Sequence, residues 1–220
     1  MILGHYGLAF ASKRIAPRAS LGTLTFAAQW LDELWPLLLL AGVEHVQSAP
    51  GLMAANSLEF VYYPFSHSLL MAVVWAAVIG AIYFVARRDK KAALTVAALV
   101  VSHWLLDLPM HRPDLPLAPG SSTNLGLGAW NSVPLTIILE LGLLSGGLAS
   151  YLRQTRSRDR IGTWALWVGV VLLLAIFAAG FASPPPPDEK TIGLGALGLW
   201  LFVPLFAWAD RHRRRVEDLS

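Results

Sequence analysis

The chain has no cysteine, and this absence removes three classes of site at once. It excludes disulfide bonds, thiolate metal ligands and cysteine nucleophiles. Three motifs are also missing: a glycine-rich phosphate-binding loop, the G-x-S-x-G of serine hydrolases and the H-E-x-x-H of zinc proteases. If the chain binds a metal, its ligands are therefore histidine and carboxylate side chains in some other arrangement.

Charged residues are scarce, at 14% of the 220 residues, whereas 55% are hydrophobic and the mean hydropathy is +0.55. This balance excludes a soluble domain, because several runs approach or exceed the ~20 apolar residues that cross a bilayer. A pI of about 9.4 would suggest nucleic-acid binding in a soluble protein, but here the basic residues stand at the ends of apolar runs. We therefore expect an integral membrane protein whose partners are membrane lipids and not nucleic acids.

Six apolar runs are long enough to cross the membrane as helices. They cover approximately residues 21–43, 66–86, 92–108, 133–151, 161–182 and 192–209. Residues 1–12 are apolar but too short to span, so we expect a half-helix that rises from Lys13 into the membrane and stops there. The alternative is a helix lying flat on the inner membrane surface. The predicted fold class is all-α: a polytopic integral membrane protein with six transmembrane helices plus a short N-terminal half-helix.

Basic residues alternate between the segments that connect these runs. Of the 17 basic residues, 15 lie in residues 1–18, 87–91, 153–160 and 211–215, which leaves only Arg112 and Lys190 for the other loops. Loops rich in Lys and Arg remain in the cytoplasm, so both termini are predicted to be cytoplasmic. Residues 1–220 then form a single membrane domain, in which 1–152 hold the candidate metal site and 153–220 supply two scaffold helices with a basic cytoplasmic tail.

The stretch 102–116, SHWLLDLPMHRPDLP, gathers ionisable side chains at the end of an apolar run. His103 and Asp107 are four residues apart, so on a helix they stand on one face. An imidazole and a carboxylate are good ligands for a divalent metal, and a bare carboxylate within the membrane is costly. The pair therefore indicates a metal; in the alternative, Asp107 only accepts hydrogen bonds from His103 and a neighbouring helix.

Ionisable side chains from three of the predicted helices share one depth in the membrane. Counting ~1.5 Å per helical residue from the nearest cytoplasmic basic residue places four of them at about 18 to 24 Å: Asp32, His103, Asp107 and Glu140. His67 lies somewhat higher, at about 30 Å, and the half-helix would bring His5 to about 12 Å. We expect these groups to meet in the outer half of the bilayer.

Four short motifs, taken in order, resemble one protein family. They are Gly4-His5, a lone Asp32 in the next apolar run, Phe65-Ser66-His67-Ser68 and Ser102-His103-x-x-x-Asp107. Over roughly residues 1–117 they resemble the bacterial inner-membrane metal-dependent hydrolases called LexA-regulated or YdjM-like. The resemblance implies a location in the bacterial inner membrane. It also implies a set of metal ligands or catalytic residues: His5, Asp32, His67, His103 and Asp107.

The chain departs from the family pattern in two places. Relatives pair two aspartates where this chain has Asp32-Glu33, and adjacent helical residues do not face the same way. Relatives also carry His-Arg-Gly-x-Thr before the His-Ser, where this chain reads YYPF. We therefore expect one divalent metal and not two, with zinc the first choice because of the histidine count.

The predicted function is hydrolysis by a metal-activated water, whose pKa falls to about 7 on the metal. Glu140 and Asp114 are the candidate general bases; Glu140 is alternatively a metal ligand or a structural hydrogen-bond acceptor. A site in the outer leaflet suits a lipid or lipid-linked ester, including a phosphoester. A transporter or channel would also place ionisable groups in the membrane, and a structural membrane protein would hold a purely structural metal.

The outer loop after the third run supplies the candidate substrate-binding residues, His111 and Arg112. His111 and Asp114 would complete the site from above or bind a substrate head group. In the alternative, Arg112 and Asp114 pair at the surface and the neighbouring prolines shape a turn. Glu44 and Glu59 in the preceding outer loop are expected to be solvated.

Overall fold

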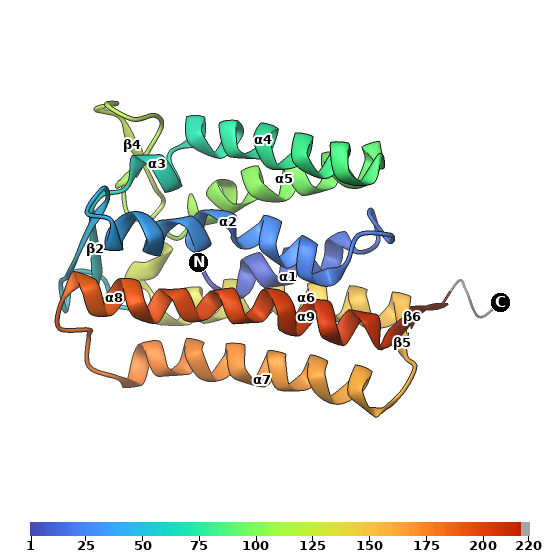
Figure 1. Ribbon diagram of the computed structural model, residues 1–220. Helices are drawn as coiled ribbons and strands as arrows, with labels where there is room; N and C mark the ends of the chain where they lie inside the picture. The colour runs from blue at the N-terminus through green and yellow to red at the C-terminus, as the bar shows by residue number, and fades with distance from the viewer. Residues whose placement is uncertain (217–220) are drawn as a thin grey trace.

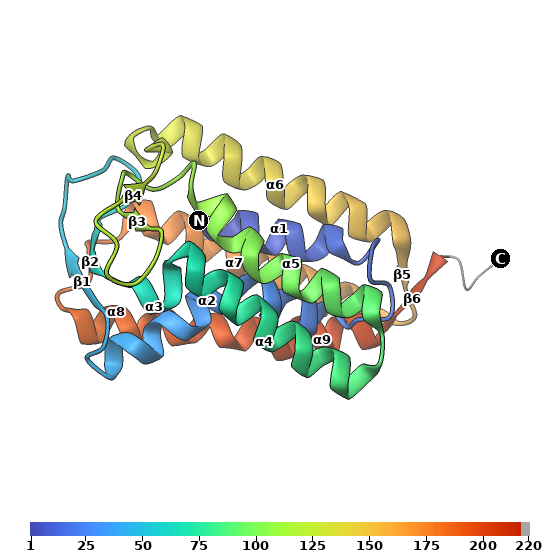
Figure 2. The same cartoon turned by 90° about the horizontal axis from the view of Figure 1, so that it is seen from above.

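Long helices dominate the structure, a computed structural model that describes residues 1–216 (Figure 1). The long helices are α2 (Leu21–Leu40), α4 (Leu69–Arg87), α5 (Lys90–Asp107), α6 (Val133–Gln154) and α7 (Arg160–Ala182). A last helical stretch is built from α8 (Glu189–Ala196), the 3-10 turn η2 (Leu197–Leu201) and α9 (Phe202–Arg211). The shorter α1 (Leu3–Ser12) lies in the middle of the bundle, where it packs against α2, α5 and α6 (Figure 2).

Short antiparallel pairs of strands close both ends of the bundle. At one end are β1 (His45–Ser48) with β2 (Leu58–Tyr62), and β3 (Leu115–Pro116) with β4 (Asn124–Leu125). The one-turn helices α3 (Pro64–His67) and η1 (Ala129–Asn131) follow these pairs. At the other end β5 (Thr155–Ser157) pairs with β6 (Arg213–Arg215), so Thr155 lies opposite Arg215. The predicted outer loops are therefore folded segments and not open coil.

Side-chain caps explain where most helices begin. Ser and Asp accept a hydrogen bond from a backbone N–H in the first turn and satisfy one of the donors that a helix start leaves free. Such caps precede α2, α4, α5, α6, α7 and α8: Ser20, Ser68, Asp89, Ser132, Asp159 and Asp188. Ser68 has extended backbone, and this splits the predicted span over residues 66–86 into α3 and α4. His67 consequently stands at the end of a separate one-turn helix.

Among the described residues, four helical segments are long and apolar enough to cross a membrane. They are α4, α6, α7 and the continuous stretch Glu189–Arg211, which contains the sixth predicted span. Glycines at 193, 195 and 198 weaken the α-helix there, and the stretch includes η2. The central helices α2 and α5 are 20 and 18 residues long and carry Asp32, His103 and Asp107. They are not among the four segments.

The basic segments gather at one end of the bundle. Figure 1 places the α1–α2 connection, the α4–α5 turn and the β5–β6 pair at the same end, and the β1–β2 and β3–β4 pairs at the opposite end. This arrangement agrees with the alternation of basic residues along the sequence. In the following, the end that carries β1 to β4 is called the hairpin end.

Two glycines bring α1 against α6. A Cβ on Gly147 would overlap the backbone of Gly7, and a Cβ on Gly7 would overlap the backbone at Leu143. Small residues of this kind let membrane helices approach backbone to backbone. The contact holds α1 inside the bundle and not on its surface.

Candidate metal centre

Five ionisable side chains converge from four helices in the middle of the bundle. They form what we call the His/Asp cluster: His5 from α1, Asp32 from α2, His67 from α3, and His103 and Asp107 from α5. These are the five ligands that the sequence predicted. All are buried except Asp32, whose side chain is 19% exposed. Asp32 is thus the one partly exposed member of the cluster.

Four atoms of the cluster stand at the spacing of metal ligands. Nε2 of His103 lies 3.2 Å from Oδ2 of Asp107 and 3.6 Å from Oδ1 of Asp32. Nε2 of His67 lies 3.3 Å from Oδ1 of Asp32 and 3.9 Å from Oδ2 of Asp107. A tetrahedral ion with bonds of ~2.1 Å separates its ligand atoms by about 3.4 Å. The ligand atoms of Asp32, His67 and His103 all lie within 4.8 Å of one another and are therefore a candidate set for one zinc-sized ion, with Asp107 beside two of them.

The other ring nitrogens of the two histidines are already engaged. Nδ1 of His103 is 2.7 Å from the carbonyl oxygen of Ala28, so this nitrogen carries the proton and donates. Nδ1 of His67 is 2.7 Å from Oγ of Ser66, which itself donates to Glu44 at 2.6 Å and so accepts from the ring. In the neutral form of each ring the proton is then on Nδ1, and the lone pair of Nε2 faces the cluster, as in metal-binding imidazoles.

Glu44 is fully buried, which corrects the expectation that it is solvated. Its Oε1 accepts the backbone N–H groups of Phe65 at 2.7 Å and Ser66 at 2.8 Å, and its Oε2 accepts the Ser66 hydroxyl. These bonds satisfy the free donors at the start of α3 and fix the residue before His67. The sequence offered no local signal for this role, because Glu44 and Ser66 are joined through the whole β1–β2 hairpin.

His5 contacts Oδ1 of Asp107, whereas His67 and His103 face its Oδ2. Its Nε2 lies 3.2 Å from Oδ1 of Asp107, and its ring stacks on His103 with centroids 3.6 Å apart. His5, His103 and Asp107 form a second triplet of potential ligand atoms, all within 4.8 Å of one another. The α-ammonium group of Met1 lies 2.6 Å from the same Oδ1 and balances the buried charge of Asp107.

Glu140 supports the cluster from α6. Its two carboxylate oxygens accept the backbone N–H groups of Ile2 and Gly4, each at 2.9 Å. Of the roles that the sequence left open for Glu140, these contacts are those of a structural hydrogen-bond acceptor. They hold the start of α1, and with it His5, at the height of the cluster.

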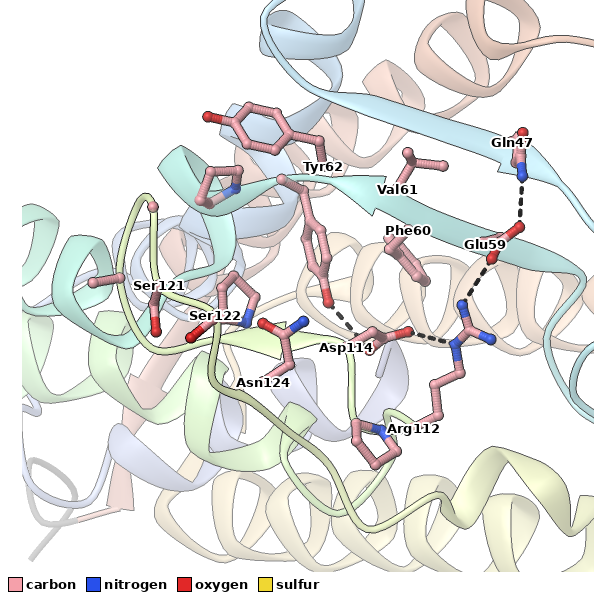
Figure 3. A pocket seen from close by; sticks show the side chains of 16 residues that line it. Gln47, Glu59, Phe60, Val61, Tyr62, Arg112, Asp114, Ser121, Ser122 and Asn124 are labelled. Carbon is pink, nitrogen blue, oxygen red and sulfur yellow. Dashed lines mark hydrogen bonds and ion pairs between the residues drawn. The ribbon is translucent and has the colours of Figure 1, made fainter.

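His111, Arg112 and Asp114 form a separate network at the hairpin end, of which Figure 3 shows Arg112 and Asp114. Oδ1 of Asp114 accepts from Nδ1 of His111 at 2.9 Å and from the hydroxyl of Tyr63 at 3.2 Å, while Oδ2 accepts from Arg112 at 3.2 Å. The ring of Tyr63 packs against His67, with centroids 5.4 Å apart. Tyr63 therefore links this network to the cluster, a role that its position before Pro64 did not suggest.

The sequence profile of the YdjM inner membrane protein family matches residues 49–184. The matched segment includes His67, His103 and Asp107; it begins after His5 and Asp32 and extends beyond residue 117, where the recognised motifs end. Curated proteins and solved structures gave no match to this chain. Because the matched segment covers more than half of the sequence, the protein belongs to the YdjM inner membrane protein family.

Proposed function

We propose that this protein is a membrane-embedded, metal-dependent hydrolase of the bacterial inner membrane that acts on a lipid or lipid-linked ester. The observation that carries the proposal is the arrangement of His67, His103, Asp32 and Asp107, whose facing atoms lie 3.2 to 3.9 Å apart while the Nδ1 atoms of both histidines are hydrogen-bonded outside the cluster. Two imidazole nitrogens and two carboxylate oxygens suit zinc. His5 is the further ligand on the other side of Asp107.

A bound zinc ion would supply an activated water at neutral pH. The protein's own part is to hold the ligands in place before the ion arrives. Ala28 fixes the ring of His103, and Ser66 fixes the ring of His67. Such second contacts typically change metal affinity by about 10- to 100-fold. The partial exposure of Asp32 supports access of a substrate ester at that residue.

The proposal includes six spans with both termini in the cytoplasm, so that the hairpin end faces outward. The separation of basic segments from β1–β4 supports this orientation (Figure 1). Together with the depths deduced from the sequence, it would put the His/Asp cluster in the outer half of the bilayer. A lipid whose head group reaches the hairpin end then has its ester bonds near the level of the cluster.

Elemental analysis of the purified protein tests the metal site. We expect about one zinc ion per chain in the wild type, and at least a tenfold loss in His103→Ala and Asp107→Ala, because each removes a ligand. His45→Ala is the matched control, since His45 is an exposed histidine at the hairpin end, hydrogen-bonded to Glu189 and outside the cluster. A wild-type protein without stoichiometric metal after purification free of chelators, and after exposure to zinc, would remove the proposal.

Hydrolysis is tested separately, with fluorescent phospholipid and glycerolipid esters in nanodiscs. Release of a fatty acid or head group by the wild type, and not by His103→Ala, is the expected result. Stoichiometric zinc without hydrolysis of any ester would assign the ion a structural role.

Transport is a second candidate, favoured by the polar face of α2 beneath the cluster. Thr25, Gln29 and Glu33 recur every four residues and are all buried. Thr25 and Glu33 have no hydrogen-bond partner for their side chains among residues 1–216. Polar groups of this kind are rare in membrane helices and often mark a path for ions or water. Zinc uptake by reconstituted vesicles, lost in Gln29→Leu, would favour transport over hydrolysis.

A further inference from the structure

A pocket of about 800 Å³ opens at the hairpin end (Figure 3). Its walls come from β1 and β2, from residues 63–64 and from the loop that contains β3 and β4. Pockets of about 300 to 1,000 Å³ are the size that holds small molecules or head groups. We call it the hairpin pocket.

The floor of the hairpin pocket is built from buried polar groups. Asp114 is only 9% exposed and Tyr63 is buried, and the Tyr63 hydroxyl donates to Asp114 at 3.2 Å. A phenol is protonated at neutral pH, so the Tyr63 hydroxyl is the donor in this bond. Because Tyr63 also packs against His67, one side chain separates the pocket from the cluster.

The charge in the pocket argues against an anionic ligand. Arg112 is the one cation among the lining residues, and two carboxylates already bind it: Glu59 at 2.9 Å and Asp114 at 3.2 Å. Hydrogen bonds from Gln47 and Arg112 lower the pKa of Glu59, so Glu59 is ionised at neutral pH. Arg112, Glu59 and Asp114 together carry one net negative charge. A phosphate group would therefore be repelled by the two carboxylates, and the guanidinium between them is already paired.

The remaining polar lining is uncharged and hydrogen-bonding: Gln47, Tyr62, Ser121, Ser122 and Asn124. Sugar hydroxyls donate to carboxylate and amide oxygens and accept from amide and hydroxyl donors. The apolar face of a sugar ring packs against aromatic side chains, which Phe60 and Tyr62 supply. An ammonium group, in contrast, would leave most of these donors without a partner.

We propose that the hairpin pocket binds an uncharged, hydroxyl-rich group, a sugar or polyol, held by the Asp114–Arg112–Glu59 network and the neutral side chains around it. In the hydrolase proposed above this group is the head group of the lipid substrate, and to that extent the inference rests on the proposed function. Binding itself requires no metal, because none of the lining residues belongs to the cluster.

Saturation-transfer NMR on protein in phospholipid nanodiscs tests the pocket with three small probes: methyl glucoside, methyl phosphate and choline. Each probe has methyl protons for detection, and detergents with sugar head groups are avoided because they would compete. We expect saturable binding of methyl glucoside to the wild type, and binding at least about fivefold weaker in Asn124→Leu, which fills the pocket from an exposed position. Asn131→Leu, the same change at an exposed asparagine outside the lining, should bind like the wild type.

Three results would overturn the inference: no binding of methyl glucoside, tighter binding of methyl phosphate or choline than of methyl glucoside, or equal binding by Asn124→Leu and Asn131→Leu. The same measurement on His103→Ala separates this inference from the proposed function. If His103→Ala binds methyl glucoside like the wild type, the inference that the hairpin pocket binds a sugar is supported, even where no hydrolysis is found. Tighter binding of glucosyl diacylglycerol than of methyl glucoside would identify the source as a lipid head group, and equal binding would identify a free sugar.

Discussion

Glu44 acts on the His/Asp cluster through a single hydroxyl group. Ser66 donates to Glu44 and accepts from Nδ1 of His67, so a proton on Nδ1 is favoured and Nε2 is left free for a metal. The chain of carboxylate, hydroxyl and imidazole therefore sets which nitrogen faces the cluster. In many metal sites a carboxylate accepts directly from the histidine ring. Here the Ser66 hydroxyl stands between the Glu44 carboxylate and the ring of His67.

Replacing Ser66 by alanine removes both hydrogen bonds while leaving every potential ligand in place. We expect zinc affinity, measured by competition with a chelating dye, to fall about 10- to 100-fold. Ser66→Thr keeps a hydroxyl and should restore most of the affinity. Ser121→Ala, an alanine substitution in the exposed loop before β4, serves as the control. Unchanged affinity in Ser66→Ala would show that the hydroxyl does not position His67.

Residues whose partners are near in sequence were predictable, and residues positioned by a folded loop were not. His103 and Asp107 face the same way because they are one helical turn apart. His67 was identified from the short motif Phe65-Ser66-His67-Ser68, which contains it. Glu44 meets Ser66 only after the β1–β2 hairpin has turned the chain back. Tyr63 gains its role from packing between His67 and Asp114, which no spacing in the sequence encodes.

At the scale of elements, the position of α1 determines whether His5 reaches the cluster. An apolar segment of 10 helical residues cannot span a bilayer, so its place must come from packing. The contact between Gly7 and Gly147 and the bonds from Glu140 supply that packing. The sequence predicted the half-helix, but it did not identify α6 as the helix that holds it.

Two adjacent glycines of α6 allow a matched test of this contact. Gly147→Ala places a methyl group against the backbone of Gly7, and we expect it to lower the free energy of unfolding by about 1–3 kcal/mol. Gly146→Ala meets open space and should be neutral or stabilising by up to about 1 kcal/mol, since alanine favours a helix. Thermal unfolding in detergent measures both. Equal melting temperatures would mean that α1 is not held by this contact.

At the scale of the whole molecule, the segments rich in basic residues lie at the end of the bundle opposite the hairpin end (Figure 1). The proposed lipid substrate and the proposed outer-leaflet position of the cluster depend on which end faces the cytoplasm, and so does the side to which the hairpin pocket opens. Of the 17 basic residues, 15 lie in residues 1–18, 87–91, 153–160 and 211–215, and two lie in the other loops. Loops rich in Lys and Arg resist translocation across the membrane. The hairpin pocket should therefore open to the outside of the inner membrane.

The lack of cysteine makes this orientation directly measurable, because a single introduced thiol is then the only one in the chain. Ser122 lies in the exposed loop before β4, and Ile15, which is 53% exposed, lies between α1 and α2 without being one of the basic residues. A membrane-impermeant maleimide added to intact spheroplasts should label Ser122→Cys and leave Ile15→Cys unlabelled, and permeabilised cells should label both. The reverse pattern would turn the hairpin end toward the cytoplasm. The metal site could then persist, but its lipid substrate would have to enter from the inner leaflet.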